Sequence, residues 1–302
     1  MELISVLMST YNETESELSQ SIESILHQTY RNIQFLIVND NPENPTLAHT
    51  LSRYAASDSR IQIVENEQNL GLVASLNRGW KLAKGQYIAR MDADDIALPH
   101  RLETQLAYLK SHSLDCTGAA IVRIDEQGQT LSDPLVFPET PEAIAKHLPK
   151  EDCVAHPTWF LKREMMEALN GYRDIRYCED YDFLLRAVEK RFRIGNCPEV
   201  CLRYRIRSCS LTVSNRATQK LTSLFLSRNR KQLDRCTPET VAAYLDSPEA
   251  KRYYAFTDYQ TQQLCSPAST AAKALELFRK FWNSKFFWAY LLQRLRHAVS
   301  AK

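Results

Sequence analysis

The sequence predicts an α/β fold, in which a mostly parallel sheet is flanked by helices, followed by a helical C-terminal appendage. Short apolar runs alternate with helical spacing of apolar residues as far as Leu109. Most of these runs stop at a polar cluster, and after residue 212 the patterns are helical only. Strands that alternate with helices form βαβ units and hence parallel sheets. We expect residues 1–212 to form the sheet domain and residues 213–302 a helical extension.

The first three predicted strands are separated by two predicted helices. Continuous apolar runs predict the strands, and apolar residues three or four positions apart predict the helices. In chain order we expect a strand at 3–8, a helix at 18–27, a strand at 33–38, a helix at 46–56 and a strand at 61–64.

A fourth strand is predicted at 87–91. A helix at 72–83 precedes it, and Gly85 follows that helix where a C-capping glycine belongs. Pro99 and a helical pattern at 101–109 come after the strand. The βαβ rhythm therefore continues through this part of the chain.

Three carboxylates follow the fourth strand: Asp92, Asp94 and Asp95. Ligands bind outside the carboxyl ends of strands in open α/β sheets. Like charges this close repel unless a cation joins them, and carboxylate oxygens suit hard divalent cations. A divalent ion that carries a diphosphate is the interpretation we favour. The alternative is that Asp94 or Asp95 only caps the next helix, but one cap needs one aspartate. The spacing does not fit an EF-hand loop.

The alternation loosens in the second half of the sheet domain. We expect a hairpin at 116–124 and 131–137, a loop and short helix at 138–147, an extended segment at 154–160, a helix at 163–169 stopped by Gly171, a helix that begins near Glu179 and Asp180, and strands at 192–195 and 200–206.

Polar residues at separate strand ends should converge on one rim of the sheet. Such a rim could bind a nucleotide through Thr10, Asn12 and Asp40 and a metal-bound diphosphate through Asp92 and Asp94. The metal could assist departure of the diphosphate as a leaving group. A hydroxyl that displaces it would need a general base to remove its proton. Glu179 and Asp180 begin a helix, where the helix dipole favours carboxylates, and we favour Asp180 as the base. The alternative is that both residues only complement the helix dipole.

Composition is that of an ordinary globular protein. The chain has 302 residues, 44% of them hydrophobic, and a formal net charge of +2. Its eight cysteines form no CxxC pair, which favours buried reduced thiols over a zinc site. The start lacks the basic region of a signal peptide, and no run approaches about 20 apolar residues. We expect a cytoplasmic protein with no membrane-spanning helix and no nucleic-acid partner.

Residues 273–302 combine aromatic side chains with seven Lys or Arg and one Glu. A basic helix with an aromatic face is typical of segments that lie on anionic lipid. The alternative is a helix docked on the protein's own core. We favour peripheral membrane contact through this segment.

An ordered set of motifs resembles family 2 of the glycosyltransferases, over residues 3 to about 210. The motifs are Thr10-Tyr11-Asn12 after the first strand, Asp40 after the second, Asn69-Leu70-Gly71 with Asn77 downstream, Asp92-Ala93-Asp94-Asp95, Glu179-Asp180, and Tyr204-Arg205-Ile206-Arg207. Each motif alone is weak, but the ordered set is specific. Members of the family are inverting enzymes with the GT-A fold.

The resemblance implies a nucleotide-sugar donor, with a UDP-sugar favoured, Mg²⁺ or Mn²⁺ as cofactor, and single displacement at the anomeric carbon. It assigns donor binding to a set of rim residues: Thr10, Tyr11, Asn12, Glu13, Asp40, Gly71, Asn77, Asp92, Ala93 and Arg207. Asp92 and Asp94 would form the DxD metal site, with Asp94 the direct ligand. Asp180, beside Glu179, would be the catalytic base. The acceptor side would comprise His156, Tyr172 and Arg173.

The expected acceptor is a glycan or a lipid-linked sugar in cell-surface polysaccharide or lipopolysaccharide synthesis, at the inner face of the cytoplasmic membrane. Two departures from the family pattern stand out. Arg207 occupies the place of a histidine that helps to hold the diphosphate, which implies a diphosphate clamp rather than a metal ligand. Asn39-Asp40-Asn41-Pro42 replaces the commoner Asp-Asp-Gly-Ser.

Other functions fit less well. A sugar nucleotidyltransferase normally has a glycine-rich loop after the first strand, and a nicotinamide-dependent enzyme needs GxGxxG there, but residues 8–13 contain no glycine. A non-catalytic sugar-binding or scaffold protein could retain the same fold. The intact acidic motifs argue against that alternative.

Overall fold

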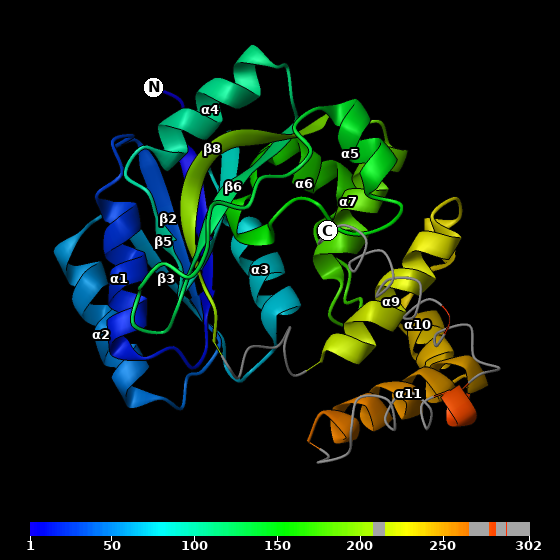
Figure 1. Cartoon of the computed structure of the whole chain (residues 1–302). Helices are drawn as coiled ribbons and strands as arrows, with labels where there is room; N and C mark the ends of the chain where they lie inside the picture. Colours follow the sequence, from blue (N-terminus) through cyan, green and yellow to red (C-terminus); the bar gives the residue numbers. More distant parts are fainter. Residues whose placement is uncertain (208–214, 266–277, 282–287, 289–302) are drawn as a thin grey trace.

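The computed structural model describes residues 1–207, 215–265, 278–281 and 288. Within these residues, an eight-stranded sheet has the order β3-β2-β1-β4-β7-β6-β8-β5, with helices on both faces (Figure 1). Four of its seven neighbouring pairs are parallel and three are antiparallel. The predicted α/β class, with a mostly parallel sheet, is confirmed.

The first half follows the predicted alternation of strands and helices. Its elements are β1 (Ile4–Thr10), α1 (Glu15–Leu26), β2 (Ile33–Asn39), α2 (Pro45–Ser57), β3 (Ile61–Glu65), α3 (Leu72–Trp80) and β4 (Tyr87–Asp92). Local chemistry sets the helix starts. Thr14 and Glu17 form a capping box on α1, and the Asn44 side chain caps α2 with Pro45 at the first turn.

The second half carries more irregular structure. Its elements are β5 (Ile96–Ala97), α4 (Arg101–Ser111), β6 (Cys116–Ile124), α5 (Pro141–His147), η1 (His156–Thr158), β7 (Phe160–Lys162), α6 (Arg163–Leu169), α7 (Glu179–Glu189) and β8 (Ile194–Arg205). Antiparallel β7 separates the parallel set β3-β2-β1-β4 from the remaining strands.

Three expectations for this half are wrong in detail. The strands at 192–195 and 200–206 are one strand, β8, which accommodates Pro198 at an irregularity in its pairing with β6. The extended segment at 154–160 is broken by η1, because Pro157 starts a 3₁₀ turn. The hairpin consists of β6 and two isolated bridges, Ile121 to Leu135 and Ile124 to Thr130.

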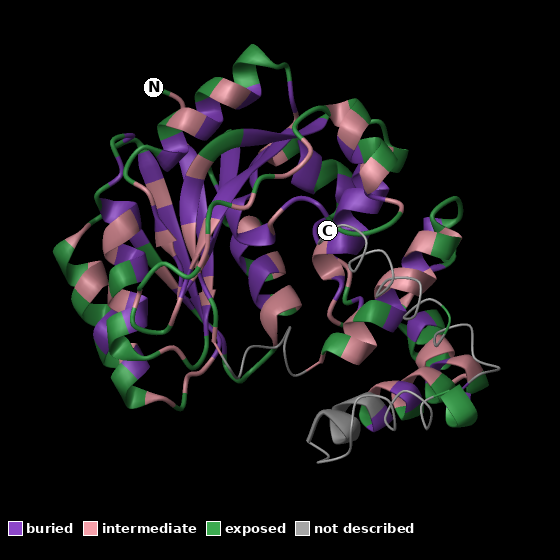
Figure 2. Cartoon of the chain, viewed as in Figure 1, coloured by how far each residue is buried: buried purple, intermediate pink, exposed green. Residues whose placement is uncertain are grey.

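Two hydrophobic cores lie on opposite faces of the sheet. Successive residues of a strand point to opposite faces, so Val6 and Met8 pack with α1 while Leu7 packs with α3. Strands β1, β2 and β4 are buried along nearly their whole length (Figure 2). Burial on both faces accounts for the apolar runs of these strands, and polar residues begin at their carboxyl ends, where Thr10, Asn39 and Asp92 lie.

The C-terminal appendage is helical, as predicted. It comprises α9 (Arg216–Asn229), η2 (Leu233–Arg235), α10 (Pro238–Leu245) and α11 (Pro248–Cys265). Leu226, Leu233 and Val241 join the core that α6 and α7 form, and Arg173 donates to the Leu233 carbonyl oxygen at 3.0 Å. The appendage thus packs against the α6–α7 side of the sheet domain (Figure 1). The expected boundary at residue 212 lies outside the described residues.

Most of the segment 273–302 also lies outside the described residues. Of those described, Phe278 and Trp288 are exposed and contact each other edge to face, whereas Phe281 is buried against Phe256 and Tyr259 of α11. Across the described part of the chain, we find no helix with the length and apolar character needed to cross a membrane.

Candidate active site

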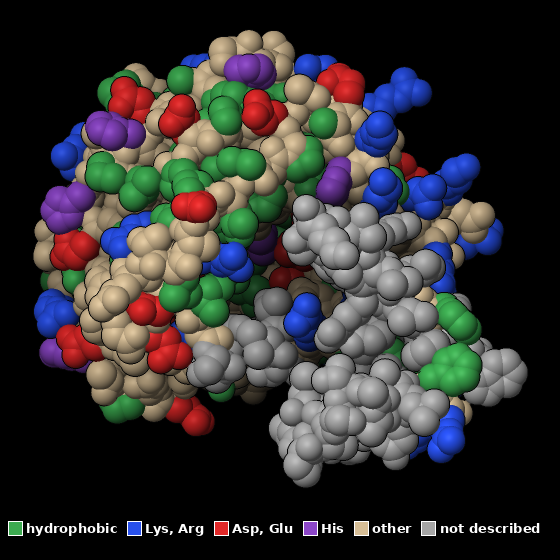
Figure 3. Space-filling view, in the orientation of Figure 1, with side chains coloured by type: hydrophobic (Ala, Val, Ile, Leu, Met, Phe, Trp, Pro, Cys, Tyr) green, Lys and Arg blue, Asp and Glu red, His purple; other side chains and the backbone are tan. Residues whose placement is uncertain are grey.

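The polar ends of three neighbouring strands meet at one rim of the sheet. In the register of the sheet, Thr10 pairs with Asn39, the residue before Asp40, and Ser9 pairs with Asp92. The predicted convergence therefore follows from parallel pairing of β1 with β2 and β4. A hollow in the surface exposes acidic side chains at its floor (Figure 3).

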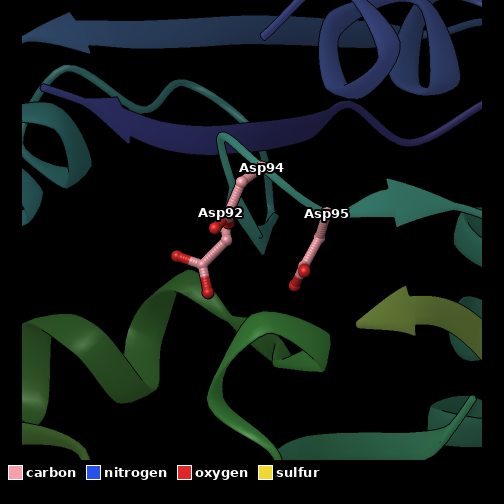
Figure 4. A group of neighbouring side chains, drawn as sticks. All are labelled: Asp92, Asp94 and Asp95. Carbon is pink, nitrogen blue, oxygen red and sulfur yellow. The ribbon is translucent and has the colours of Figure 1, made fainter. Parts of the chain in front are cut away.

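Asp92, Asp94 and Asp95 form a compact cluster at this rim. Each offers a carboxylate oxygen, and these oxygens all lie within 4.8 Å of one another. The side chains extend from the turn after β4 toward the same side (Figure 4). Ser21 fixes this turn by donating to the Asp92 carbonyl oxygen at 2.8 Å.

Asp95 is fully buried and holds the turn to β8. Its Oδ1 accepts the backbone N–H of Arg205 at 2.7 Å, while its Oδ2 has no hydrogen-bond partner among the described residues. Burial, reinforced by Asp92 and Asp94, raises the pKa of Asp95 well above its ordinary value. Helix capping does not explain these acids, because His100 is the N-cap of α4.

Asp94 faces the guanidinium of Arg207. The Arg207 Nε lies 2.9 Å from Asp94 Oδ2. Burial, reinforced by the charge of Asp92, raises the pKa of Asp94 to about 7, and Arg207 opposes that rise. The tetrapeptide 204–207 thus closes over the acidic turn, as Arg205 Nε also donates to the Asp94 carbonyl oxygen at 2.7 Å.

Arg90 is a central residue that the sequence analysis missed. It lies on β4, is 3% exposed, and forms an ion pair with Asp92. Burial lowers the pKa of Arg90, but the charge and hydrogen bond of Asp92, together with the charges of Tyr172 and Asp95, outweigh burial and leave that pKa raised. Behind it, Arg101 donates to the Arg90 carbonyl oxygen at 2.6 Å. The signal was an arginine inside an otherwise apolar strand, two residues before an aspartate.

Asp40 binds a turn of its own chain. Its Oδ1 accepts Asn66 Nδ2 at 2.7 Å and the Leu70 N–H at 2.8 Å, and its Oδ2 accepts the Gly71 N–H at 2.9 Å. Gly71 has φ +84°, a conformation that favours glycine. Asp40 is 3% exposed, and its hydrogen bonds hold residues 69–71 against the rim.

The segment after β1 surrounds one carboxylate. Glu13 Oε2 accepts the Thr10 hydroxyl at 2.6 Å and the Tyr11 N–H at 2.8 Å. Tyr11 and Asn12 are exposed, whereas Thr10 is buried. Together with Ala93, which is buried in the acidic turn, these predicted donor-binding residues lie at the strand ends.

Asn77 lies away from this group. Its amide group binds the backbone of Tyr172: Nδ2 donates to the Tyr172 carbonyl oxygen at 2.8 Å, and Oδ1 accepts the Tyr172 N–H at 2.9 Å. The neighbouring Gly171 has φ +67°, and a Cβ there would lie 2.4 Å from Asn77 Oδ1. Asn77 thus connects α3 to the loop that contains Gly171 and Tyr172.

On the predicted acceptor side, His156 and Tyr172 form one unit. His156 Nε2 and the Tyr172 hydroxyl are hydrogen-bonded at 2.9 Å, and both rings pack on Trp159. Burial and the charge of Arg90 hold the pKa of His156 well below its ordinary value, so this imidazole is neutral. Two of the three predicted acceptor-side residues therefore lie together, and their role in acceptor binding stays a prediction.

Arg173 turns away from this unit. Its Nε donates to Asp182 Oδ2 at 3.0 Å, and Arg186 Nε approaches the same oxygen at 2.8 Å. Asp182 is fully buried between these two arginines. Arg173 therefore joins α7 to the appendage through Leu233, and its donors serve the fold.

Glu179 and Asp180 begin α7 and differ in their environments. Burial, followed by the charge of Asp180, raises the pKa of Glu179 to about 8. Burial also raises the pKa of Asp180, but the Tyr181 N–H, 2.7 Å from Asp180 Oδ1, and the charge of Arg90 oppose this. Both side chains are partly exposed. Near neutral pH Glu179 holds a proton. The pKa of Asp180 is raised as well, but the Tyr181 N–H and the charge of Arg90 stabilise its anion against burial.

Comparison with known proteins agrees with this geometry. The family model for glycosyl transferase family 2 matches residues 5–169. The O-antigen biosynthesis glycosyltransferase WbnJ of Escherichia coli is 34% identical over 223 residues, which cover 73% of this chain and 83% of WbnJ.

Two solved structures share the fold. Staphylococcus aureus TarS 1–349 in complex with UDP-GlcNAc has a TM-score of 0.56 at 17% identity, covering 77% of this chain and 70% of TarS. Mannosyltransferase PcManGT from Pyrobaculum calidifontis, in complex with GDP-Man and Mn²⁺, has a TM-score of 0.58 at 14% identity. The match covers 95% of this chain and 82% of PcManGT. The chain belongs to glycosyl transferase family 2 and has the GT-A fold.

Proposed function

We propose that the protein transfers a sugar, with inversion, from a nucleotide-sugar to a hydroxyl of a glycan or lipid-linked acceptor. The observation that carries this proposal is the gathering of Asp92 and Asp94 beside Asp40 and Thr10 at one rim, within electrostatic reach of Asp180. Residues 1–212 would be the catalytic domain, and residues 213–302 the helical extension.

The acidic cluster fits a divalent cation. Carboxylate oxygens within 4.8 Å of one another are ligands that Mg²⁺ and Mn²⁺ prefer, and the unpartnered Oδ2 of Asp95 adds negative potential. Asp92 and Asp94 would hold the ion, with Asp94 as the direct ligand. A bound ion would supply neutralisation of the charge on the departing diphosphate.

The donor would lie over the strand ends. Thr10, Asn12 and Asp40 would hold the nucleoside, because they lie at the carboxyl ends of the neighbouring strands β1 and β2. TarS and PcManGT were solved with UDP-GlcNAc and GDP-Man, and both bases carry a ring N–H. We favour a UDP-sugar. Arg207, close to Asp94, would pair with the diphosphate.

Asp180 would be the base. A carboxylate that stays anionic can take the proton from an acceptor hydroxyl as that oxygen attacks the anomeric carbon. The protonated Glu179 beside it would donate a hydrogen bond rather than compete for the proton. Attack from the side opposite the diphosphate, with no covalent intermediate, inverts the anomeric centre.

A screen of donors tests the proposal. Nucleotide-sugars with UDP, GDP and other bases would each be added with Mn²⁺, and the midpoint of thermal unfolding measured. A ligand at about 100 times its Kd adds about 2.7 kcal/mol to the unfolding free energy, so one class of donor should raise the midpoint clearly. EDTA should remove most of that shift. If no nucleotide-sugar shifts the midpoint with or without Mn²⁺, the proposal is wrong.

We further propose that the enzyme works at the inner face of the cytoplasmic membrane, in cell-surface polysaccharide or lipopolysaccharide synthesis. Support comes from the likeness to WbnJ, whose name refers to O-antigen biosynthesis, and from the basic, aromatic segment 273–302. Phe278 and Trp288 expose aromatic surface, and Arg279 and Lys280 lie between them in the chain.

Membrane contact predicts a specific loss. Replacing Phe278 and Trp288 together with alanine should weaken cosedimentation with anionic vesicles by about tenfold or more, because each aromatic ring buries apolar area in the lipid interface. Leu131→Ala, at a site exposed elsewhere on the protein, is the matched control and should sediment as the unmodified protein does. Equal sedimentation of the double variant and the unmodified protein would count against membrane contact.

A further inference from the structure

Arg207 lies among three carboxylates that come from separate parts of the chain. Its guanidinium is 2.9 Å from Asp94, 3.6 Å from Glu17 of α1 and 4.0 Å from Glu13. The Arg207 side chain is 19% exposed, so solvent screens these interactions only in part. Arg207 thus lies among three carboxylates of the described residues, and the shortest of these three distances is to the predicted metal ligand.

The two glutamates are fixed anchors. Glu13 Oε2 is engaged with Thr10 and Tyr11, and Glu17 Oε2 accepts the Thr14 N–H at 2.9 Å in the capping box of α1. The surrounding chain holds these two carboxylates in place. They would therefore keep the Arg207 guanidinium near the rim even when it releases Asp94. The guanidinium can therefore move by a small distance without losing all of its partners.

The arginines balance the charge of the acidic turn. Arg90 pairs with Asp92 and Arg207 pairs with Asp94, so each proposed metal ligand already has a cationic partner. A divalent cation that arrives alone has to compete with Arg207 for Asp94 and meets the positive charge of both arginines. A diphosphate that arrives with the cation brings negative charge, and phosphate oxygens are strong partners for a guanidinium.

We propose that Arg207 is the resident counter-ion of Asp94, which keeps a lone divalent cation from binding and exchanges Asp94 for the diphosphate when nucleotide and cation arrive together. This inference rests on the proposed function and deepens it. Metal and nucleotide then bind with positive coupling, and Arg207 is the source of that coupling. By linkage, the factor by which nucleotide strengthens Mn²⁺ binding equals the factor by which Mn²⁺ strengthens nucleotide binding.

The experiment measures Mn²⁺ binding directly, from the electron paramagnetic resonance signal of free Mn²⁺, with and without UDP or GDP. The unmodified protein should bind Mn²⁺ weakly alone and about tenfold or more tightly with one of the two nucleotides. Arg207→Gln should bind Mn²⁺ alone about tenfold more tightly. Repulsion between two positive charges a few ångströms apart in a protein is strong enough to change an affinity by about that factor. Its coupling to the nucleotide should shrink correspondingly.

Two further variants separate charge from structure. Arg207→Lys keeps the charge and should behave like the unmodified protein. Arg203→Gln removes a cation four residues earlier, on β8, that donates to the Gly128 carbonyl oxygen rather than to an acid of the turn, and should change nothing. The thermal midpoint of each variant reports whether it is folded.

The outcomes are distinct. If Arg207→Gln is folded and binds Mn²⁺ alone no more tightly than Arg203→Gln does, while the unmodified protein binds Mn²⁺ with nucleotide, the inference is overturned and the proposed function stands. If Asp94→Asn leaves Mn²⁺ binding with nucleotide unchanged, or the unmodified protein binds no Mn²⁺ under either condition, both the inference and the proposed metal site are wrong.

Discussion

Asp180→Asn is expected to lower kcat for sugar transfer by about 10²–10⁴-fold, which is the usual contribution of a general base. Asparagine keeps the size of the side chain and can still accept the Tyr181 N–H through its amide oxygen, but it cannot take a proton from the acceptor. The donor does not need the base in order to bind, so its Kd should stay within about twofold. Initial rates with saturating donor and titration calorimetry of the donor measure the two quantities.

The neighbouring carboxylate provides the control for this variant. Glu179→Gln keeps a neutral hydrogen-bonding group, and near neutral pH Glu179 is itself protonated because burial and Asp180 raise its pKa to about 8. Its kcat should therefore fall far less than that of Asp180→Asn. Unimpaired turnover in Asp180→Asn would remove Asp180 as the base, and a larger loss in Glu179→Gln would transfer the role to Glu179.

Asp94→Ala is expected to abolish metal-dependent transfer, with kcat/KM lower by about 10³-fold or more. Charge stabilisation by a metal ion on a leaving group contributes several kcal/mol, and about 1.4 kcal/mol corresponds to a factor of ten. The same variant should lose the Mn²⁺-dependent part of donor binding, which Mn²⁺ titrations of the donor Kd would show. Asp133→Asn changes an exposed aspartate in the loop after β6 and is the matched control. Transfer that still depends on Mn²⁺ in Asp94→Ala would contradict the assignment.

Much of the sheet domain is predictable from local patterns. Elements β1 to β4 follow from apolar runs and capping residues that act within a few positions, such as the capping box of Thr14 and Glu17. Convergence of the strand ends follows from parallel pairing, which the βαβ rhythm implies. The position of Asp92 beside the end of β1 was therefore within reach of the sequence.

Contacts between residues far apart in the chain could not be predicted from the sequence. Arg205 binds Asp95 and the Asp94 carbonyl oxygen across more than a hundred residues, and no local pattern marks that contact. Asn77 and Arg173 are polar residues in motif positions, but their partners, Tyr172 and Asp182, decide where their side chains point. The direction of a side chain depends on the residues that pack against it, and these are known only once the complete fold is known.

Irregular backbone was the other source of error. Two strands were expected at 192–195 and 200–206, yet the pairing of β6 with β8 shifts its register there and a single strand continues through Pro198. Pro157 lies in a segment that reads as extended and instead turns, which brings His156 against Tyr172. Both features lie in the half of the sheet domain that carries the predicted acceptor-side residues.

The most direct test of the central claim is a crystal structure with Mn²⁺ and UDP or GDP, with diffraction collected at the manganese absorption edge. The account predicts one anomalous peak, at a manganese ion coordinated by a carboxylate oxygen of Asp94 and by the diphosphate. The base of the nucleotide should lie at Asp40, and Asp180 should face the side of the donor sugar opposite the diphosphate. A nucleotide bound elsewhere, or a manganese peak with no contact to Asp92 or Asp94, would contradict it.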